Sequence, residues 1–127
     1  MGSRAQISTE FFIFIGLAFL IAIAFEIASV QQINELRVKN EDEAVKDLAL
    51  KIQREFFIAS YVEDGYARTF TIPDQLDRID YALIERNHTI TVQSKNSIYI
   101  VSVPDSTGNV TKGANQIKKT GGVIYIN

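Results

Sequence analysis

The chain has 127 residues, 46% of them hydrophobic and 22% charged, which suits one small domain. Its formal net charge is −2, and Lys and Arg are scattered among acids, which argues against the basic surface that nucleic-acid binding normally needs, so no nucleic-acid partner is expected. The sequence has no cysteine, which excludes disulfide bonds, thiol chemistry and cysteine metal sites.

The first ten residues combine a short basic leader with a polar segment. Met1–Ala5 carries one positive charge, at Arg4, and Gln6–Glu10 reads Gln-Ile-Ser-Thr-Glu. An ordinary secretory signal has no carboxylate between its charge and its apolar core. Here Glu10 occupies that place, and an acid buried in a membrane segment costs a few kcal/mol. The position of Glu10 therefore suggests that its carboxylate has a function.

Residues Phe11–Val30 form an apolar segment whose main interruptions are Glu26 and Ser29. About twenty helical residues span about 30 Å, the thickness of the hydrocarbon core of a bilayer. The uninterrupted part, Phe11–Phe25, is shorter than a typical span, and tilt or snorkelling would bring Glu26 to the interface. The sequence predicts a transmembrane helix here.

The helical pattern continues beyond this segment, because no proline or glycine occurs between Leu17 and Tyr61. One helix is therefore expected from about Ser8 to about Ser60, with Gly65 as its terminator. We expect its second half to turn one apolar face to a sheet and to present Glu41-Asp42-Glu43 to solvent. Apolar residues recur on that face at three- and four-residue spacing, and Phe57 is expected to pack with the last of them: Val45, Leu48, Ala49, Ile52 and Phe56.

From Tyr66 onward the sequence is typical of strands, with many β-branched and aromatic residues. Short turns between the runs favour an antiparallel meander. Asp105–Gly108 is expected to be a turn, and Gly113–Gly122 a polar excursion between strands. The predicted fold class is α+β, a long N-terminal helix with a small antiparallel β-sheet head domain. The expected strands are Tyr66–Ile72, Ile79–Arg86, His88–Ser94, Ser97–Val103 and Val123–Ile126.

The order of features at the N-terminus resembles the class III signal peptide of archaeal type IV pilin-like proteins. Those proteins carry a short basic leader, a Gln at the cleavage point, a Ser two residues later, a Glu at the fifth mature position, and then an apolar helix. Gln6, Ser8, Glu10 and Phe11–Val30 match this arrangement. The leader departs from the pattern in being very short, with a single Arg, and the strand region carries no signature of the family.

The resemblance implies cleavage between Ala5 and Gln6 by a prepilin peptidase, with the apolar helix kept on the mature protein. It also implies self-association into a filament, driven by a membrane platform protein and an assembly ATPase. The chain would lie in membrane lipid as a prepilin and then at the cell surface. It would comprise a leader (1–5), a transmembrane and filament-core helix (6–30), an amphipathic helix (31–60) and a β head domain (61–127).

Burial of Glu10 in a bundle of such helices suggests a role in assembly. Its carboxylate could pair with the α-ammonium group that cleavage creates on Gln6 of a neighbour, or receive polar groups such as Ser8 and Thr9. An unpaired buried charge is penalised, so only one axial stagger would be acceptable. We hypothesise that Gln6, Ser8 and Glu10 set the register of the filament.

Two other interpretations stay open. In the first, the chain is a single-pass anchor for a binding or accessory module, or a minor pilin, and the helix dipole favours Glu10. In the second, Ala22-Ile23-Ala24 is a secretory cleavage site, which would release a β-domain beginning at Phe25. Positive charges flank both ends of the span, at Arg4 and at Arg37, so they leave the topology open.

The remaining signals are local. Asn87-His88-Thr89 and Asn109-Val110-Thr111 are N-glycosylation sequons in expected turns, so Asn87 and Asn109 are candidate modification sites. His88 is the only histidine, and no spacing of acids matches a calcium loop, so no metal or other cofactor is expected. No nucleophile, base and orienting acid can be assembled from motifs, so no catalytic residue is expected and the chain is not expected to be an enzyme.

Overall fold

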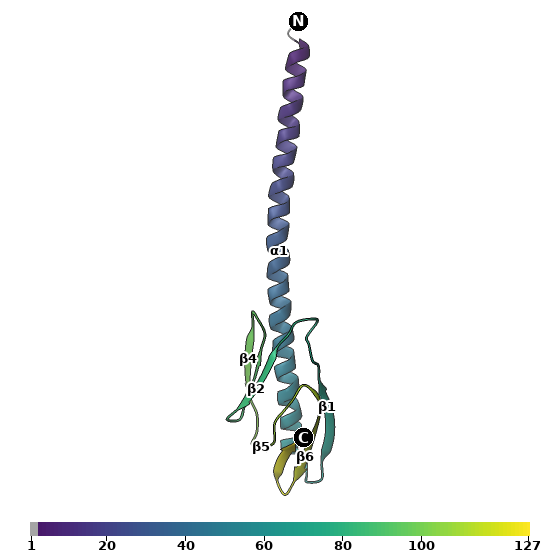
Figure 1. Cartoon of the computed structure of the whole chain (residues 1–127), viewed down its shortest axis with the longest axis vertical. Helices are drawn as coiled ribbons and strands as arrows, with labels where there is room; N and C mark the ends of the chain where they lie inside the picture. The colour runs from purple at the N-terminus through teal and green to yellow at the C-terminus, as the bar shows by residue number, and fades with distance from the viewer. Residues whose placement is uncertain (1–2) are drawn as a thin grey trace. The chain divides into compact units, whose positions relative to one another are not determined.

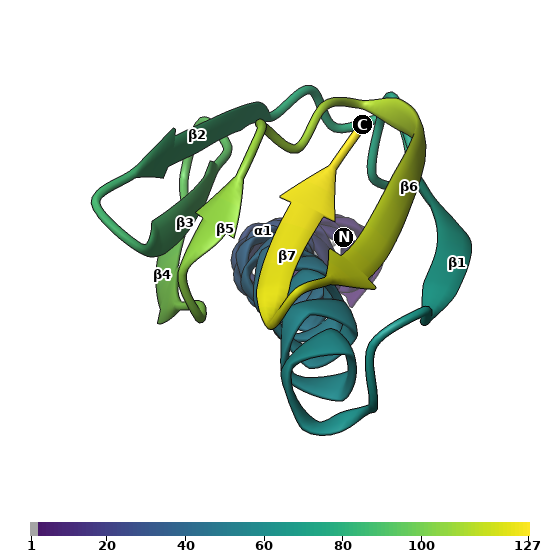
Figure 2. The same cartoon turned by 90° about the horizontal axis from the view of Figure 1, so that it is seen from below.

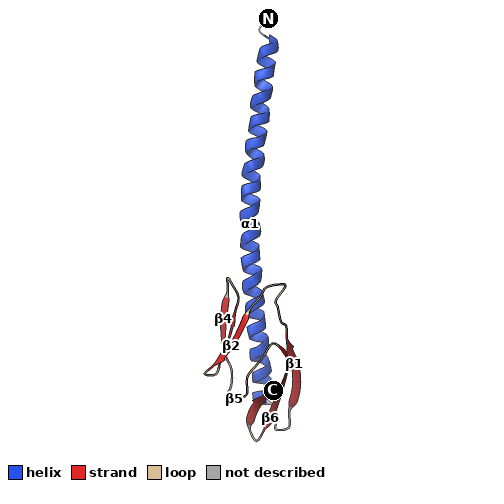
Figure 3. Ribbon diagram, viewed as in Figure 1, coloured by secondary structure: helices blue, strands red, loops and turns tan. Residues whose placement is uncertain are grey.

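The computed structural model describes residues 3–127, with side chains from Thr9 onward. These residues form one helix and seven strands (Figure 3). The chain divides into two compact parts, Met1–Arg37 and Val38–Asn127. In chain order the elements are α1 (Ser3–Tyr61), β1 (Ala67–Ile72), β2 (Ala82–Arg86), β3 (Thr89–Gln93), β4 (Ile98–Ser102), β5 (Ser106–Thr107), β6 (Gly113–Thr120) and β7 (Val123–Ile126).

The single continuous helix expected from the sequence is confirmed as α1. Its last carbonyl groups are held by a lysine from a distant strand: Lys119 Nζ donates to the carbonyl of Ser60 at 2.7 Å and to that of Val62 at 2.8 Å. A cation there satisfies free carbonyls and interacts favourably with the helix dipole. Gly65, the predicted terminator, follows with a φ of 95°, which glycine adopts without steric cost.

The strands lie beside the C-terminal end of α1 (Figure 1) and curve around it (Figure 2). They form two sheets, with strand orders β1-β6-β7-β5 and β2-β3-β4. Every pairing is antiparallel except that of β5 with β7. The predicted meander is confirmed as β2-β3-β4, and the fold is α+β, one long N-terminal helix followed by a small, mainly antiparallel β region.

The core of this region forms where the predicted apolar face of α1 meets the sheets. All five predicted face residues are buried, and Ile52 and Phe56 are 1% and 0% exposed. The prediction for Phe57 was wrong, because this ring is 40% exposed and stacks on that of Tyr61. Successive helical residues point about 100° apart, and this step carries Phe57 off the buried face that Phe56 occupies. The main partners from the strands are Ile72, Ile90, Val92, Ile117 and Ile126.

The polar excursion expected at Gly113–Gly122 is wrong, because Gly113–Thr120 forms β6, the longest strand in the described residues. Its inward positions include Asn115 and Lys119, which obscure the alternation of apolar and polar residues. Asn115 is 1% exposed, and its side chain bonds the backbone of Thr111 and of Gly113. Lys119 caps α1. Both polar groups are therefore satisfied inside the fold, which permits a strand with few apolar inward residues.

The predicted turn at Asp105–Gly108 contains the two-residue strand β5, which pairs in parallel with β7. Gly108 ends this strand with a φ of 107°. A Cβ atom on Gly108 would lie 2.0 Å from the carbonyl oxygen of Ile126, so any side chain would displace the backbone of β7. The chain therefore requires glycine where β5 approaches β7.

Candidate functional site

The first candidate site is the surface of α1 within the part Met1–Arg37. From Thr9 to Arg37 every side chain except Ser29 is exposed, including Phe12 at 69% and Phe25 at 74%. The hydroxyl group of Ser29 donates to the carbonyl of Phe25 within the same helix. A helix that is apolar on all sides belongs in lipid or in a bundle. Within the described residues nothing covers this surface, so it requires an apolar environment from outside the chain.

By length and composition, α1 is long and apolar enough to cross a membrane. None of its most apolar stretch is buried within the chain, which distinguishes it from the core helix of a soluble domain. The prediction of an apolar N-terminal helix able to span a membrane is therefore confirmed, and such a helix is compatible with membrane anchoring.

Glu10 lies in α1 at the beginning of the apolar surface, with its side chain exposed. Glu26, also exposed, follows about 24 Å further along the helix. The side chains of Ala5, Gln6 and Ser8 lie outside the described part of the chain. Cleavage between Ala5 and Gln6, and a register role for Gln6, Ser8 and Glu10, stay predictions.

One face of the apolar helix is hollowed. Ile15, Ala18, Phe19 and Ala22 line a shallow, open groove. These positions share one face because they follow the three- and four-residue spacing of a helix. Small residues four positions apart let the backbone of a second helix approach closely. Ala18 and Ala22 therefore give α1 a helix-packing surface, flanked by two large side chains.

The part Val38–Asn127 begins with acids that bind a turn. Glu41 Oε1 accepts from the backbone N–H of Asn96 at 3.2 Å, and Glu41 Oε2 accepts from its Nδ2 at 2.8 Å. Asp42 Oδ1 accepts from Ser97 Oγ at 2.6 Å. Glu41 lies outside the predicted membrane span. Hydrogen bonds from Ser94 and Asn96 hold the pKa of its carboxyl group below the ordinary value. The expectation of a solvated face at these acids is wrong for Glu41, which is 7% exposed.

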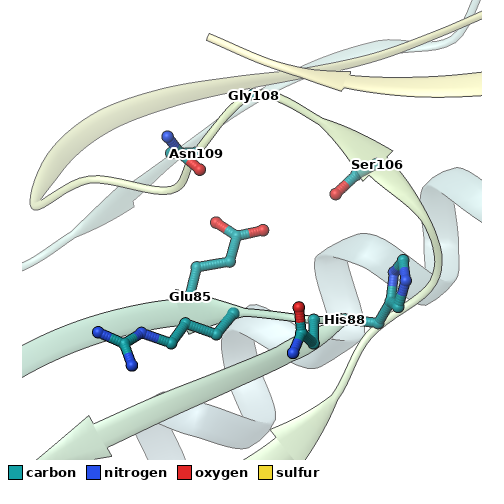
Figure 4. Close-up of a pocket in the computed structure, with 7 residues that line it drawn as sticks. Glu85, His88, Ser106, Gly108 and Asn109 are labelled. Atoms are coloured by element: carbon teal, nitrogen blue, oxygen red, sulfur yellow. The ribbon is translucent and has the colours of Figure 1, made fainter.

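The two predicted modification residues lie at one polar pocket of the β region (Figure 4). Asn87 lies in the turn between β2 and β3, and Asn109 lies in the loop between β5 and β6, and both are exposed. The carboxylate of Glu85 points toward that loop. The pocket has a volume of about 280 Å³ and is lined by Glu85, Arg86, Asn87, His88, Ser106, Gly108 and Asn109.

The histidine and acids of the chain do not converge on a metal site in the part that the structure describes. No group of three or more His, Asp or Glu side chains there could hold an ion. His88 instead pairs with a single exposed acid, Asp105, with Nδ1 and Oδ1 2.7 Å apart.

We compared the chain with models of known protein families, with curated protein sequences and with solved structures, and none of them matched. The interpretation of the chain therefore depends on its own residues and geometry.

Proposed function

We propose that the chain is a structural subunit of an archaeal type IV pilus-like surface filament. The observation that carries the proposal is the exposed apolar surface of α1, which begins directly after the carboxylate of Glu10. In this function a prepilin peptidase removes residues 1–5, and a platform protein and an ATPase move the subunit from the membrane into the filament. The head domain then lies at the cell surface.

The apolar surface suits both stages of this path. Moving a helix from lipid into a bundle of apolar helices costs little hydrophobic energy, so packing and polar contacts decide the outcome. The groove at Ala18 and Ala22 would let a second helix pack closely. Glu10 supplies the polar contact, through the new α-ammonium group of Gln6 in a neighbouring copy. Any other axial stagger would bury the carboxylate without this partner, which is energetically unfavourable.

The deciding experiment compares Glu10→Ala with Glu26→Ala in the full chain. Both changes remove one exposed carboxylate from the same helix. Only Glu10 lies next to the predicted cleavage point, so Glu10→Ala should abolish filaments in electron micrographs while membrane insertion is retained. Glu26→Ala should still assemble. Normal filaments from the Glu10 variant would contradict the proposed register.

A second pair of variants tests the packing surface. Ala18→Leu with Ala22→Leu fills the groove, whereas Ala24→Leu adds the same kind of side chain on the opposite face of α1. Both keep the helix apolar, so both should enter the membrane. The first should assemble far less than the second if helices approach at Ala18 and Ala22.

The competing function is a membrane-anchored binding or accessory module that never polymerises. It is favoured by the part Val38–Asn127, which has its own core and is a compact unit by itself. Mass spectrometry of the mature N-terminus distinguishes the candidates. A start at Gln6 supports prepilin processing, and an intact start supports the plain anchor. A start at Phe25 would mean that the apolar segment is discarded and the protein is a secreted β-domain.

A further inference from the structure

The two sequons are far apart in sequence but line the same pocket, together with Glu85 and Ser106. A pocket of about 280 Å³ is just below the usual range for ligand sites, so it has room for one small polar group at most. Two glycans attached at its rim would compete for this space. The two asparagines are therefore neighbours in space, although they lie 22 positions apart in the sequence.

The β2–β3 sequon is tied into a β-ladder. Asn87 and His88 form a two-residue turn with φ values of 46° and 62°, the conformation of a type I′ hairpin. Thr89 begins β3, where it pairs with Arg86 on one side and Ser102 on the other. Its hydroxyl group also donates to the carbonyl of Arg86 at 2.5 Å. An enzyme that must bind both Asn87 and Thr89 in its active site would have to open the hairpin.

The other sequon lies outside the strands, between β5 and β6. Within residues 3–127 the side-chain amide of Asn109 makes no hydrogen bond, and its backbone carbonyl accepts from Asn127 Nδ2. Thr111 is exposed, and its backbone N–H donates to Asn115 Oδ1 at 2.8 Å. Its hydroxyl group contacts the same oxygen at 3.5 Å, a longer contact than the 2.5 Å bond of the Thr89 hydroxyl group. Asn109 and Thr111 can therefore be reached without breaking strand pairing.

The pocket offers hydrogen-bonding groups suited to sugar hydroxyls. Glu85 Oε2 accepts from the backbone N–H of Val110 at 2.9 Å, which fixes the carboxylate beside the Asn109 loop. Figure 4 shows this carboxylate and the hydroxyl group of Ser106 directed into the same space. A carboxylate accepts up to about four hydrogen bonds, and a hydroxyl group both donates and accepts. A sugar joined to Asn109 would find both.

We propose that Asn109 is the single glycosylation site of the folded chain, and that its first sugar occupies this pocket and covers Asn87. The co-reactant is a saccharide linked through diphosphate to a lipid. The amide nitrogen of Asn109 attacks the anomeric carbon, a C–N bond forms, and the C–O bond to diphosphate breaks. The lipid diphosphate leaves with the bonding electrons, and the amide releases one proton to a base.

The test uses purified full-length chain in detergent with an oligosaccharyltransferase and its lipid-linked oligosaccharide. Because reaction in detergent needs neither export nor assembly, the result is separate from the filament proposal. The enzyme is first shown to modify two synthetic peptides, Ile84–Val92 and Ser106–Ala114, at similar rates. Intact mass and glycopeptide mapping then give the number and position of glycans on the folded chain.

We expect one glycan per folded chain, attached to Asn109. Asn87→Gln should leave the yield unchanged, and Asn109→Gln should reduce it at least tenfold. Two glycans per chain, a glycan on Asn87, or no reaction of the folded chain would each overturn the proposal.

Amide hydrogen exchange tests the position of the sugar. Exchange at Asn87 and His88 should slow in the glycosylated chain relative to the unmodified chain, because the sugar covers their turn. Unchanged exchange at that turn would overturn the placement of the sugar in the pocket.

Discussion

The two parts of the chain use the same apolar residue types in opposite ways. Val38–Asn127 buries Phe56 and Ile52 against two sheets, whereas Met1–Arg37 leaves Phe12 and Phe25 exposed, although one helix supplies them all. Burying such a side chain is worth about 1.5–3 kcal/mol. The second part gains this energy by folding. The first can gain it only in lipid or against another molecule.

The strongest test of this difference truncates one phenylalanine in each part. Phe56→Ala should destabilise the head domain by about 3–5 kcal/mol, because it leaves a cavity beneath the sheets. Phe25→Ala should change head stability by no more than about 0.5 kcal/mol, since Phe25 is 74% exposed. Urea unfolding of the full chain in detergent, followed by tyrosine fluorescence, measures both. Equal losses would show that the two parts do not fold independently.

A smaller effect tests whether the head domain depends on the close approach of β5 to β7 as well as on the burial of apolar side chains. Gly108→Ala should cost about 1–3 kcal/mol, because its φ is positive and its Cβ would meet Ile126. Gly121→Ala, with a φ of 59° and open space around it, should cost about 1 kcal/mol. Thermal unfolding of both variants gives the difference. A Gly108 variant as stable as the Gly121 variant would show that β5 and β7 adjust freely.

The smallest expected effect is a pH dependence near the start of the head. The pKa of Glu41 is lowered in the folded chain, so its contribution is present above the ordinary value of 4.5 and is lost as pH falls through the folded pKa. Glu41→Gln should therefore have a lower Tm than the wild type at pH 7. The gap should close below about pH 4.5, as circular dichroism would show. A constant gap would mean that the carboxylate charge has no role.

Periodicity alone predicted the parts of the fold that depend on local pattern. The apolar face ending at Phe56 and the β2-β3-β4 meander follow from spacing and turn chemistry. Strand β6 was missed because Asn115 and Lys119 point inward, and their bonding partners are visible only in the folded chain. A sequence pattern treats such residues as solvated, whereas the fold satisfies them.

The same limit applies to the candidate sites. Glu10 and the apolar helix after it could be identified directly, because their order along the chain is the signal. The shared pocket of Asn87 and Asn109 could not, because it depends on a loop packing against a hairpin. The buried state of Glu41 was hidden for the same reason, since Asn96, its partner, is 55 residues away.

The cap on α1 has a consequence for synthesis. Ser60 is made 59 residues before Lys119, the side chain that closes its carbonyl group. At about 5–20 residues synthesised per second, about 3–12 s pass between the synthesis of the helix end and that of Lys119. Until then the strands that cover the apolar face of α1 are incomplete. During that interval the nascent chain exposes two apolar surfaces, the N-terminal apolar segment of α1 and the apolar face of its second half. A factor that shields apolar surfaces during translation would therefore benefit this chain more than a protein whose core forms from neighbouring residues.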